Sequence, residues 1–264
     1  MRNRLLIGVL SLCTLALAFP RTVSAQDHVA ELGVRFWKPS PGLVISSGGL
    51  TGVGLSNVDF VQEFGIESTS FPELRASIGR GHKLRISKVS FDYNADATIQ
   101  RTIVFQGRRL TVGAPASTDI AWDLWTFGYE WDFISRSGGF LGFVTDLKFN
   151  KVAASIASPL LSSAATTDVT VPVPTIGFIG RAYLGSVGAI TSEFTGLSLN
   201  RTDKDSGDVF EGKFYDFDIY ATINLGKHLG VQGGYRSVDV HYIVDDDSGD
   251  LEMKGPYFGG ALRF

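Results

Sequence analysis

Two pairs of residues near the C-terminus have types and spacing that could do chemistry. Asp239 and His241 are separated by one residue, and Asp216 and Asp218 show the same spacing in an earlier apolar segment. Alternate residues of a β-strand share a face, so each pair would present its two polar groups together. A carboxylate beside an imidazole can activate water as a general base. These four residues are therefore the candidates for a hydrolytic site.

Signatures of other catalytic or cofactor sites are scarce. The sequence contains no phosphate-binding glycine loop, zinc-ligand spacing or nucleophile elbow. An Asp-Ser-Gly-Asp phrase occurs twice and supplies Asp205, Asp208, Asp247 and Asp250. Such carboxylates could bind calcium or the divalent ions that bridge surface lipids, although no full calcium-binding loop is present. We therefore predict a non-enzymatic protein without a cofactor, and treat these aspartates only as candidate metal ligands.

Further charged residues alternate with large apolar residues along the chain. In 126–133, for example, aromatic residues occupy every second position, and Glu130 and Asp132 stand between them. The charged residues that we expect on the same inner face are Glu31, Arg35, Arg75, Arg85, Glu130, Asp132, Asp146, Lys148, Arg181, Glu193, Asp216 and Asp218. They could form a salt-bridged plug in a narrow barrel, or line a small pore or ligand pocket.

The alternation has period two almost throughout, which is typical of β-strands with one apolar face. The predicted strands are 28–38, 71–80, 83–93, 118–134, 139–151, 171–185, 188–200, 212–226, 229–243 and 251–264. Short and long connections alternate between them, as in outer-membrane barrels. We therefore predict a closed antiparallel transmembrane β-barrel of about ten strands. Eight strands is the alternative, because 71–93 is the least certain stretch.

Two strands interrupt this alternation. The apolar phase changes near Ser87-Lys88 in 83–93 and near Arg236-Ser237 in 229–243. A β-bulge would explain each change, and so would a wrong register. Because of the change at Arg236, the alternation does not decide whether Asp239 and His241 point into the barrel or outward. The segment 39–70 is also open to two interpretations, because 58–66 could form a short helix or strand that plugs the barrel or could belong to an exterior loop.

The N-terminus has the order of a secretory signal peptide. Arg2 and Arg4 precede an apolar run from Leu5 to Phe19, and Val23-Ser24-Ala25 provides small residues for cleavage. We predict a signal peptide at 1–25, export through the Sec route, and one barrel domain at 26–264. The lone cysteine, Cys13, lies within the leader, and the chain beyond it is acidic. This balance argues against a nucleic-acid partner.

The chain ends in an alternating apolar strand whose last residue is Phe264, with Leu262, Gly260 and Phe258 in step behind it. This strand resembles the C-terminal strand of small bacterial outer-membrane β-barrel proteins of the general OmpA-like and OmpW-like kind. The resemblance implies an outer-membrane location in a Gram-negative bacterium, contact with lipid and lipopolysaccharide, and recognition of the last strand by the barrel assembly machinery. The spacing of Asp239 and His241 also resembles the Asp-x-His of ten-stranded outer-membrane proteases.

The sequence thus predicts a barrel with a structural, surface-interaction or narrow-pore role for small solutes. Two alternatives remain open. A barrel hydrolase or protease would use a site at the exterior rim, and a soluble periplasmic β-sandwich would bury the apolar faces against each other. No residue pattern identifies a solute or ligand.

Overall fold

The computed structural model describes residues 28–46, 57–105, 108–161, 164–202, 209–244 and 247–264. The predicted signal peptide lies outside these residues. So do Asp205, Asp208 and the side chain of Asp247. Within the described part of the chain, no helix has the length and apolar character needed to cross a membrane.

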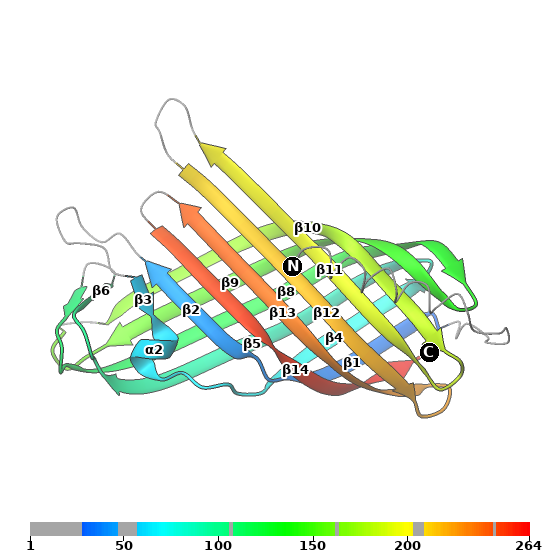
Figure 1. Ribbon diagram of the computed structural model, residues 1–264, viewed down its shortest axis with the longest axis horizontal. Coiled ribbons are helices and arrows are strands. Elements are labelled where there is room, and N and C mark those ends of the chain that lie inside the picture. Colours follow the sequence, from blue (N-terminus) through cyan, green and yellow to red (C-terminus); the bar gives the residue numbers. More distant parts are fainter. Residues whose placement is uncertain (1–27, 47–56, 106–107, 162–163, 203–208, 245–246) are drawn as a thin grey trace, which may run out of the picture.

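Ten antiparallel strands form a closed barrel (Figure 1). They are β1 (Ala30–Trp37), β4 (Phe71–Arg80), β5 (His82–Thr98), β8 (Pro115–Arg136), β9 (Gly139–Ala157), β10 (Ala165–Leu184), β11 (Gly188–Thr202), β12 (Val209–Asn224), β13 (Leu229–Val244) and β14 (Asp247–Arg263). Each strand pairs with its neighbour in this order, and β1 pairs with β14 to close the wall. The predicted transmembrane barrel is confirmed, with ten strands rather than eight.

The two ends of the barrel differ in their connections. At one end, here called the turn end, strands are joined by very short turns such as the single residue Gly81 between β4 and β5. The Val29 N–H donates to the Phe264 carbonyl at 2.7 Å, so the last strand also ends there. The longer connections lie at the opposite end, here called the loop end.

The segment 39–70 contributes to the wall and to the interior at the loop end. It contains β2 (Ser40–Ser46), β3 (Asn57–Asp59) and α2 (Phe60–Phe64). β2 continues the line of β1, because both pair with β14, β1 near its end and β2 near its start. Asp59 caps α2 by accepting the N–H groups of Val61 and Gln62. Part of this segment is therefore wall, and part of it packs inward.

An apolar belt surrounds the turn-end half. Large exposed apolar residues lie on the outward face of every barrel strand there, including Leu32, Val34, Leu74, Ile78, Leu84, Ile86, Trp125, Phe127, Tyr129, Trp131, Phe133, Leu141, Phe178, Phe194, Phe217, Val231, Phe258 and Leu262. Such a belt with a polar interior is typical of a barrel that faces lipid. Trp125, Trp131, Phe133 and Phe258 are aromatic residues of this belt and are exposed on its outer face.

Beyond the belt, the two faces of the wall exchange character. On β5, Leu84 and Ile86 point outward, whereas Val89 and Phe91 are buried inside the barrel. The pairing of β5 with β8 runs without a register shift through Ser87 and Lys88. The apolar phase does change near Ser87-Lys88, but the two predicted explanations, a β-bulge or a wrong register, are wrong. The strand continues without interruption, and its apolar residues move from the outer to the inner face.

The same correction applies to β13. Arg236 and Val238 are both buried inside, and the pairing of β13 with β12 and β14 is continuous through them. A bulge at Arg236-Ser237 is therefore absent from this part of the structure. Tyr235, Asp239 and His241 lie on the outward face of the strand.

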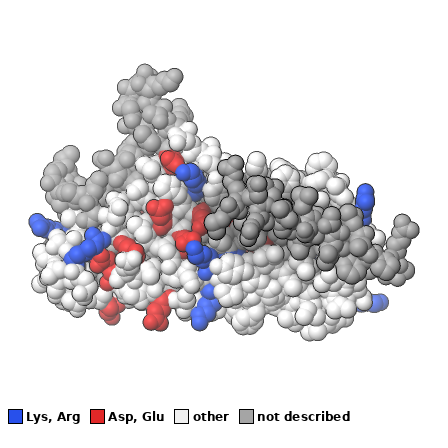
Figure 2. All heavy atoms as spheres, in the orientation of Figure 1, with Lys and Arg blue, Asp and Glu red and all other residues white. Residues whose placement is uncertain are grey.

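Because the apolar residues face inward beyond the belt, they form a hydrophobic core at the loop end, here called the distal core. It joins the inner faces of the long strands to α2 and to the hairpin of β6 (Ile103–Phe105) and β7 (Arg108–Leu110). Its large, fully buried side chains include Trp37, Leu43, Phe60, Phe91, Phe105, Leu124, Ile156, Phe214 and Met253. Burial also raises the pKa of the Tyr93 phenol in this core. Figure 2 shows that charged residues gather on the outer surface of this half, whereas the belt is almost free of them.

Candidate functional site

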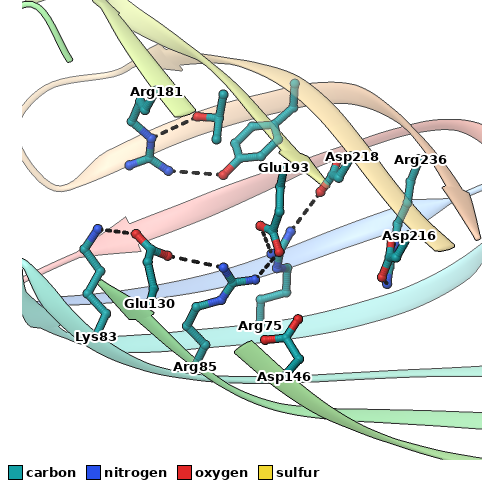
Figure 3. Close-up of polar contacts among 12 residues, drawn as sticks. Arg75, Lys83, Arg85, Glu130, Asp146, Arg181, Glu193, Asp216, Asp218 and Arg236 are labelled. Carbon is teal, nitrogen blue, oxygen red and sulfur yellow. Dashed lines mark hydrogen bonds and ion pairs between the residues drawn. The ribbon is translucent and has the colours of Figure 1, made fainter. Parts of the chain in front are cut away.

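Charged side chains from all ten barrel strands converge inside the turn-end half (Figure 3). The structure places every residue of the predicted inner-face set there: Glu31, Arg35, Arg75, Arg85, Glu130, Asp132, Asp146, Lys148, Arg181, Glu193, Asp216 and Asp218. Four more charged residues join them, namely Glu73, Lys83, Arg236 and Arg263. Cations and carboxylates are then equal in number, which is the condition for burying many charges without a net charge.

Asp218 on β12 is the meeting point of three strands. Its Oδ2 lies 2.8 Å from Arg35 Nη1 and 3.0 Å from Arg75 Nη1. The Tyr257 hydroxyl donates to its Oδ1 at 2.6 Å. The Arg35 guanidinium is also sandwiched between the rings of Tyr220 and Tyr257, with Cζ 4.4 and 4.5 Å from the ring centroids. Cation–π contacts of this kind add to the ion pairs and hold Arg35 in place.

The ion pairs continue from Arg75 toward β8. Arg75 Nη2 lies 3.6 Å from Glu193 Oε2, and Arg85 donates to the other oxygen of Glu193. Arg85 Nη1 lies 3.3 Å from Glu130 Oε2. Lys83 then bridges Glu130 and Asp132, at 2.5 and 2.8 Å.

The ion pairs also continue from Arg35 toward β9. Arg35 lies 4.0 Å from Glu73, whose other oxygen accepts from Arg236 at 2.9 Å. Arg236 holds Asp216 in a bidentate pair at 3.0 and 2.8 Å. Lys148 Nζ lies 2.5 Å from the same carboxylate. The result is one unbroken chain of ion pairs from β8 to β9, here called the lumen network.

Asp146 sits at the β9 end of the lumen network. Gly128 on the next strand makes room for it, because a Cβ at residue 128 would lie 2.0 Å from Asp146 Oδ1. Asp146 Oδ2 lies 3.8 Å from Lys148 Nζ, and both carboxylate oxygens are buried without a hydrogen-bond partner among the described residues.

The lumen network leaves little open space. A cavity of about 60 Å³ lies beside it, toward the turn end, lined among others by Glu31, Arg75, Arg85, Arg181 and Glu193. This volume holds only a few water molecules. Figure 3 shows Arg181 on its own side of this group, with its guanidinium directed to Thr191 and Tyr220 at 2.9 and 3.1 Å. The lumen is thus filled by side chains at mid-barrel.

The sequence analysis did not predict Glu73, Lys83, Arg236 and Arg263 as inward-facing, although the alternation of the strands could have identified some of them. Glu73 and Lys83 each stand two residues before a predicted inner arginine, so extending the alternation would have found them. Arg263 shares the inner face of β14 with Tyr257. Arg236 was not predicted to point inward, because the apolar alternation of its strand changes phase at that residue.

The candidate hydrolytic residues do not form one site. Asp216 and Asp218 are buried inside the barrel and are held by cations. Asp239 and His241 lie on the outward face of β13. His241 Nδ1 lies 2.5 Å from Asp250 Oδ1, across the strand pair. The barrel wall therefore separates Asp216 and Asp218 from Asp239 and His241. The two pairs cannot activate the same water molecule.

Of the four candidate metal ligands, Asp250 is the one whose side chain lies among the described residues. Asp250 is exposed on the outer face, where its described partner is His241. Among the described residues, no group of three or more His, Cys, Asp or Glu side chains could hold a metal ion.

The outer surface of the loop end carries pairs of exposed, opposite charges. Lys213 donates to Glu211 two residues earlier on β12. This hydrogen bond lowers the pKa of Glu211 and raises the pKa of Lys213. The equivalent hydrogen bond from Lys254 to Glu252 raises the pKa of Lys254. Exposed pairs of this kind contribute little to stability.

Similarity to known proteins is found in the fold and not in the sequence. No protein-family model matches the chain, and no curated protein sequence matches it. Among solved structures, the outer membrane protease OmpT from Escherichia coli superposes with a TM-score of 0.59 at 10% identity, covering 92% of this chain and 99% of OmpT. The translocator domain of autotransporter NalP from Neisseria meningitidis gives a TM-score of 0.44 at 10% identity, covering 100% of this chain and 96% of that domain.

At such low identity the likeness to OmpT concerns the fold alone. The resemblance of the last strand to OmpA-like and OmpW-like barrels is not tested by this likeness and stays a prediction. Ten strands, a continuous apolar belt and the superposition on OmpT together lead to one conclusion. The chain has the fold of the bacterial outer-membrane β-barrels.

Proposed function

We propose that this protein is a non-conducting barrel in the outer membrane of a Gram-negative bacterium, with a structural or surface-interaction role. In this proposal the turn end faces the periplasm and the loop end faces the exterior. The observation that carries the proposal is the lumen network, whose ion pairs join strands that are not neighbours in the wall. Arg85 of β5 pairs with Glu193 of β11, and Arg35 of β1 pairs with Asp218 of β12.

A second barrier supports the same function. The distal core fills the loop-end half with apolar side chains, including Phe60 of α2 and Phe105 of β6. A small polar solute would have to cross both the lumen network and this core. The outer surface of the loop-end half is rich in charge (Figure 2), which suits contact with lipopolysaccharide headgroups or a partner outside the cell.

Conductance in a planar lipid bilayer tests this proposal. The protein is purified in detergent, inserted, and compared with an open porin in the same bilayer. The matched variant carries Arg85→Ser and Glu193→Ser, which removes an opposite pair beside the cavity and leaves Arg75 with Asp218 and Lys83 with Glu130. We expect both proteins to stay silent. Discrete steps in the parent protein that change size in the variant would instead establish a narrow pore.

We further propose that the barrel has no enzymatic activity. The separation of Asp239 and His241 from Asp216 and Asp218 supports this view. Turnover of a peptide or lipid substrate that Asp239→Ala and His241→Ala abolish would contradict it. We also propose that lipid and lipopolysaccharide surround the belt, and that the assembly machinery reads the last strand through Phe264, which is exposed at the turn end.

A further inference from the structure

The wall of the barrel is open between β10 and β11 at the loop end. These strands pair only from Ile176 with Gly196 to Leu184 with Gly188. Beyond that point β10 stays paired with β9 back to Ala165, and β11 stays paired with β12 up to Thr202. Figure 1 shows β11 and β12 projecting away from the other strands at this end. We call the unpaired stretch, 165–175 on β10 and 197–202 on β11, the seam.

Two prolines explain why the pairing stops. The Tyr183 N–H donates to Gly138, on the β9 side of β10. Backbone groups of successive residues point to opposite sides of a strand, and the register of β10 is continuous. Even-numbered residues therefore direct their nitrogen toward β11, and Pro172 and Pro174 are even-numbered. Each removes a donor that the ladder with β11 would need.

The seam begins at the outer edge of the apolar belt. With a rise of about 3.4 Å per residue and a tilt of about 40°, roughly ten residues cross a band about 25 Å tall. Counted from the turn end, this reaches Thr175 on β10 and Leu197 on β11. The last formed pair is one residue earlier on each strand, Ile176 with Gly196. The open wall thus adjoins lipid-facing residues, since Ile176 and Phe194 are exposed at its lower end.

The seam exposes the inner face of the wall, and most of the described side chains on that face are apolar. Thr175 and Thr195 are buried inside, so residues at alternate positions from them share the inner face. These include Val171 and Leu199, which are nevertheless 44% and 48% exposed. Val173, two residues closer to the belt than Val171, packs against the distal core. An apolar path therefore leads from the belt through the seam to the distal core.

We propose that the seam binds a hydrocarbon chain of an outer-leaflet lipid. The chain would run from the belt beside Ile176 and Phe194 to Val173 and Leu199. A hydrocarbon chain needs no hydrogen bonds, which suits an edge that has lost two donors. An added β-strand would need those donors from β10, so the observations favour lipid over a protein strand.

Quenching by brominated lipid tests the proposal. In a Cys13→Ser background, a bimane label on Val173→Cys reports on the seam. The matched control is Val240→Cys, because Val240 is also a half-buried valine packed against the distal core, but lies on β13 away from the seam. Phe178→Cys is the lipid-facing reference, with 62% exposure. Each protein is reconstituted in phosphatidylcholine vesicles with or without bromine on the acyl chains.

We expect the Val173 label to lose at least half as much fluorescence as the Phe178 label, and the Val240 label to lose almost none. Equal, weak quenching of the Val173 and Val240 labels would overturn the proposal. A second readout uses Leu199→Cys, which stays monomeric under oxidation if lipid occupies the seam. Disulfide-linked dimers in vesicles, together with an unquenched Val173 label, would assign the seam to a second copy of the chain and also overturn it.

Discussion

At the scale of single residues, position relative to the wall decides what a carboxylate does. Asp218 receives three donors inside the barrel, from Arg35, Arg75 and Tyr257. Asp239, on the outward face of the next strand, accepts one hydrogen bond from Ser237 at 3.1 Å. The two aspartates therefore form a natural pair for comparison.

We expect Asp218→Ala to lower the free energy of unfolding by about 3–5 kcal/mol, because it leaves the buried guanidinium of Arg35 and the partly buried guanidinium of Arg75 without their shared partner. Asp239→Ala serves as the control and should change it by less than about 1 kcal/mol. Urea unfolding in lipid vesicles, followed by tryptophan fluorescence, measures both. Equal losses for the two variants would mean that the lumen network does not stabilise the barrel.

At the scale of elements, β10 shows how two residues end a ladder. Replacing Pro172 and Pro174 by threonine restores both donors toward β11. We expect the β10–β11 pairing to extend, so that amide exchange across 197–199 slows in hydrogen-exchange mass spectrometry. Pro159→Thr, in the turn after β9, is the control and should leave this segment unchanged. Unaltered exchange in the double variant would show that strand divergence, rather than the missing donors, keeps the seam open.

At the scale of the whole molecule, the lipid-facing belt decides in which solvent the chain can fold. The belt exposes Phe178, Phe258 and many similar side chains, which only lipid or detergent can cover. We expect the chain to fold in detergent or lipid as a compact species whose gel mobility changes on heating. A soluble monomer in plain buffer, with native strand content, would contradict the membrane-embedded architecture and favour the sandwich alternative.

The sequence by itself determined the strands and most of the inner charged residues. Alternation with period two is a local property, because successive side chains of a strand point to opposite faces. It therefore located all ten barrel strands and residues such as Glu130 and Arg181 without knowledge of the fold. It also indicated which connections are short.

The tertiary structure alone decided which charges meet and where the faces exchange character. Arg35 and Asp218 are 183 positions apart, and only barrel closure brings them to 2.8 Å. The apparent phase breaks at Ser87 and Arg236 are points where the wall leaves the apolar belt, so that the apolar side must turn inward. A period-two pattern carries no information on what surrounds each face, because lipid and protein interior both favour apolar side chains.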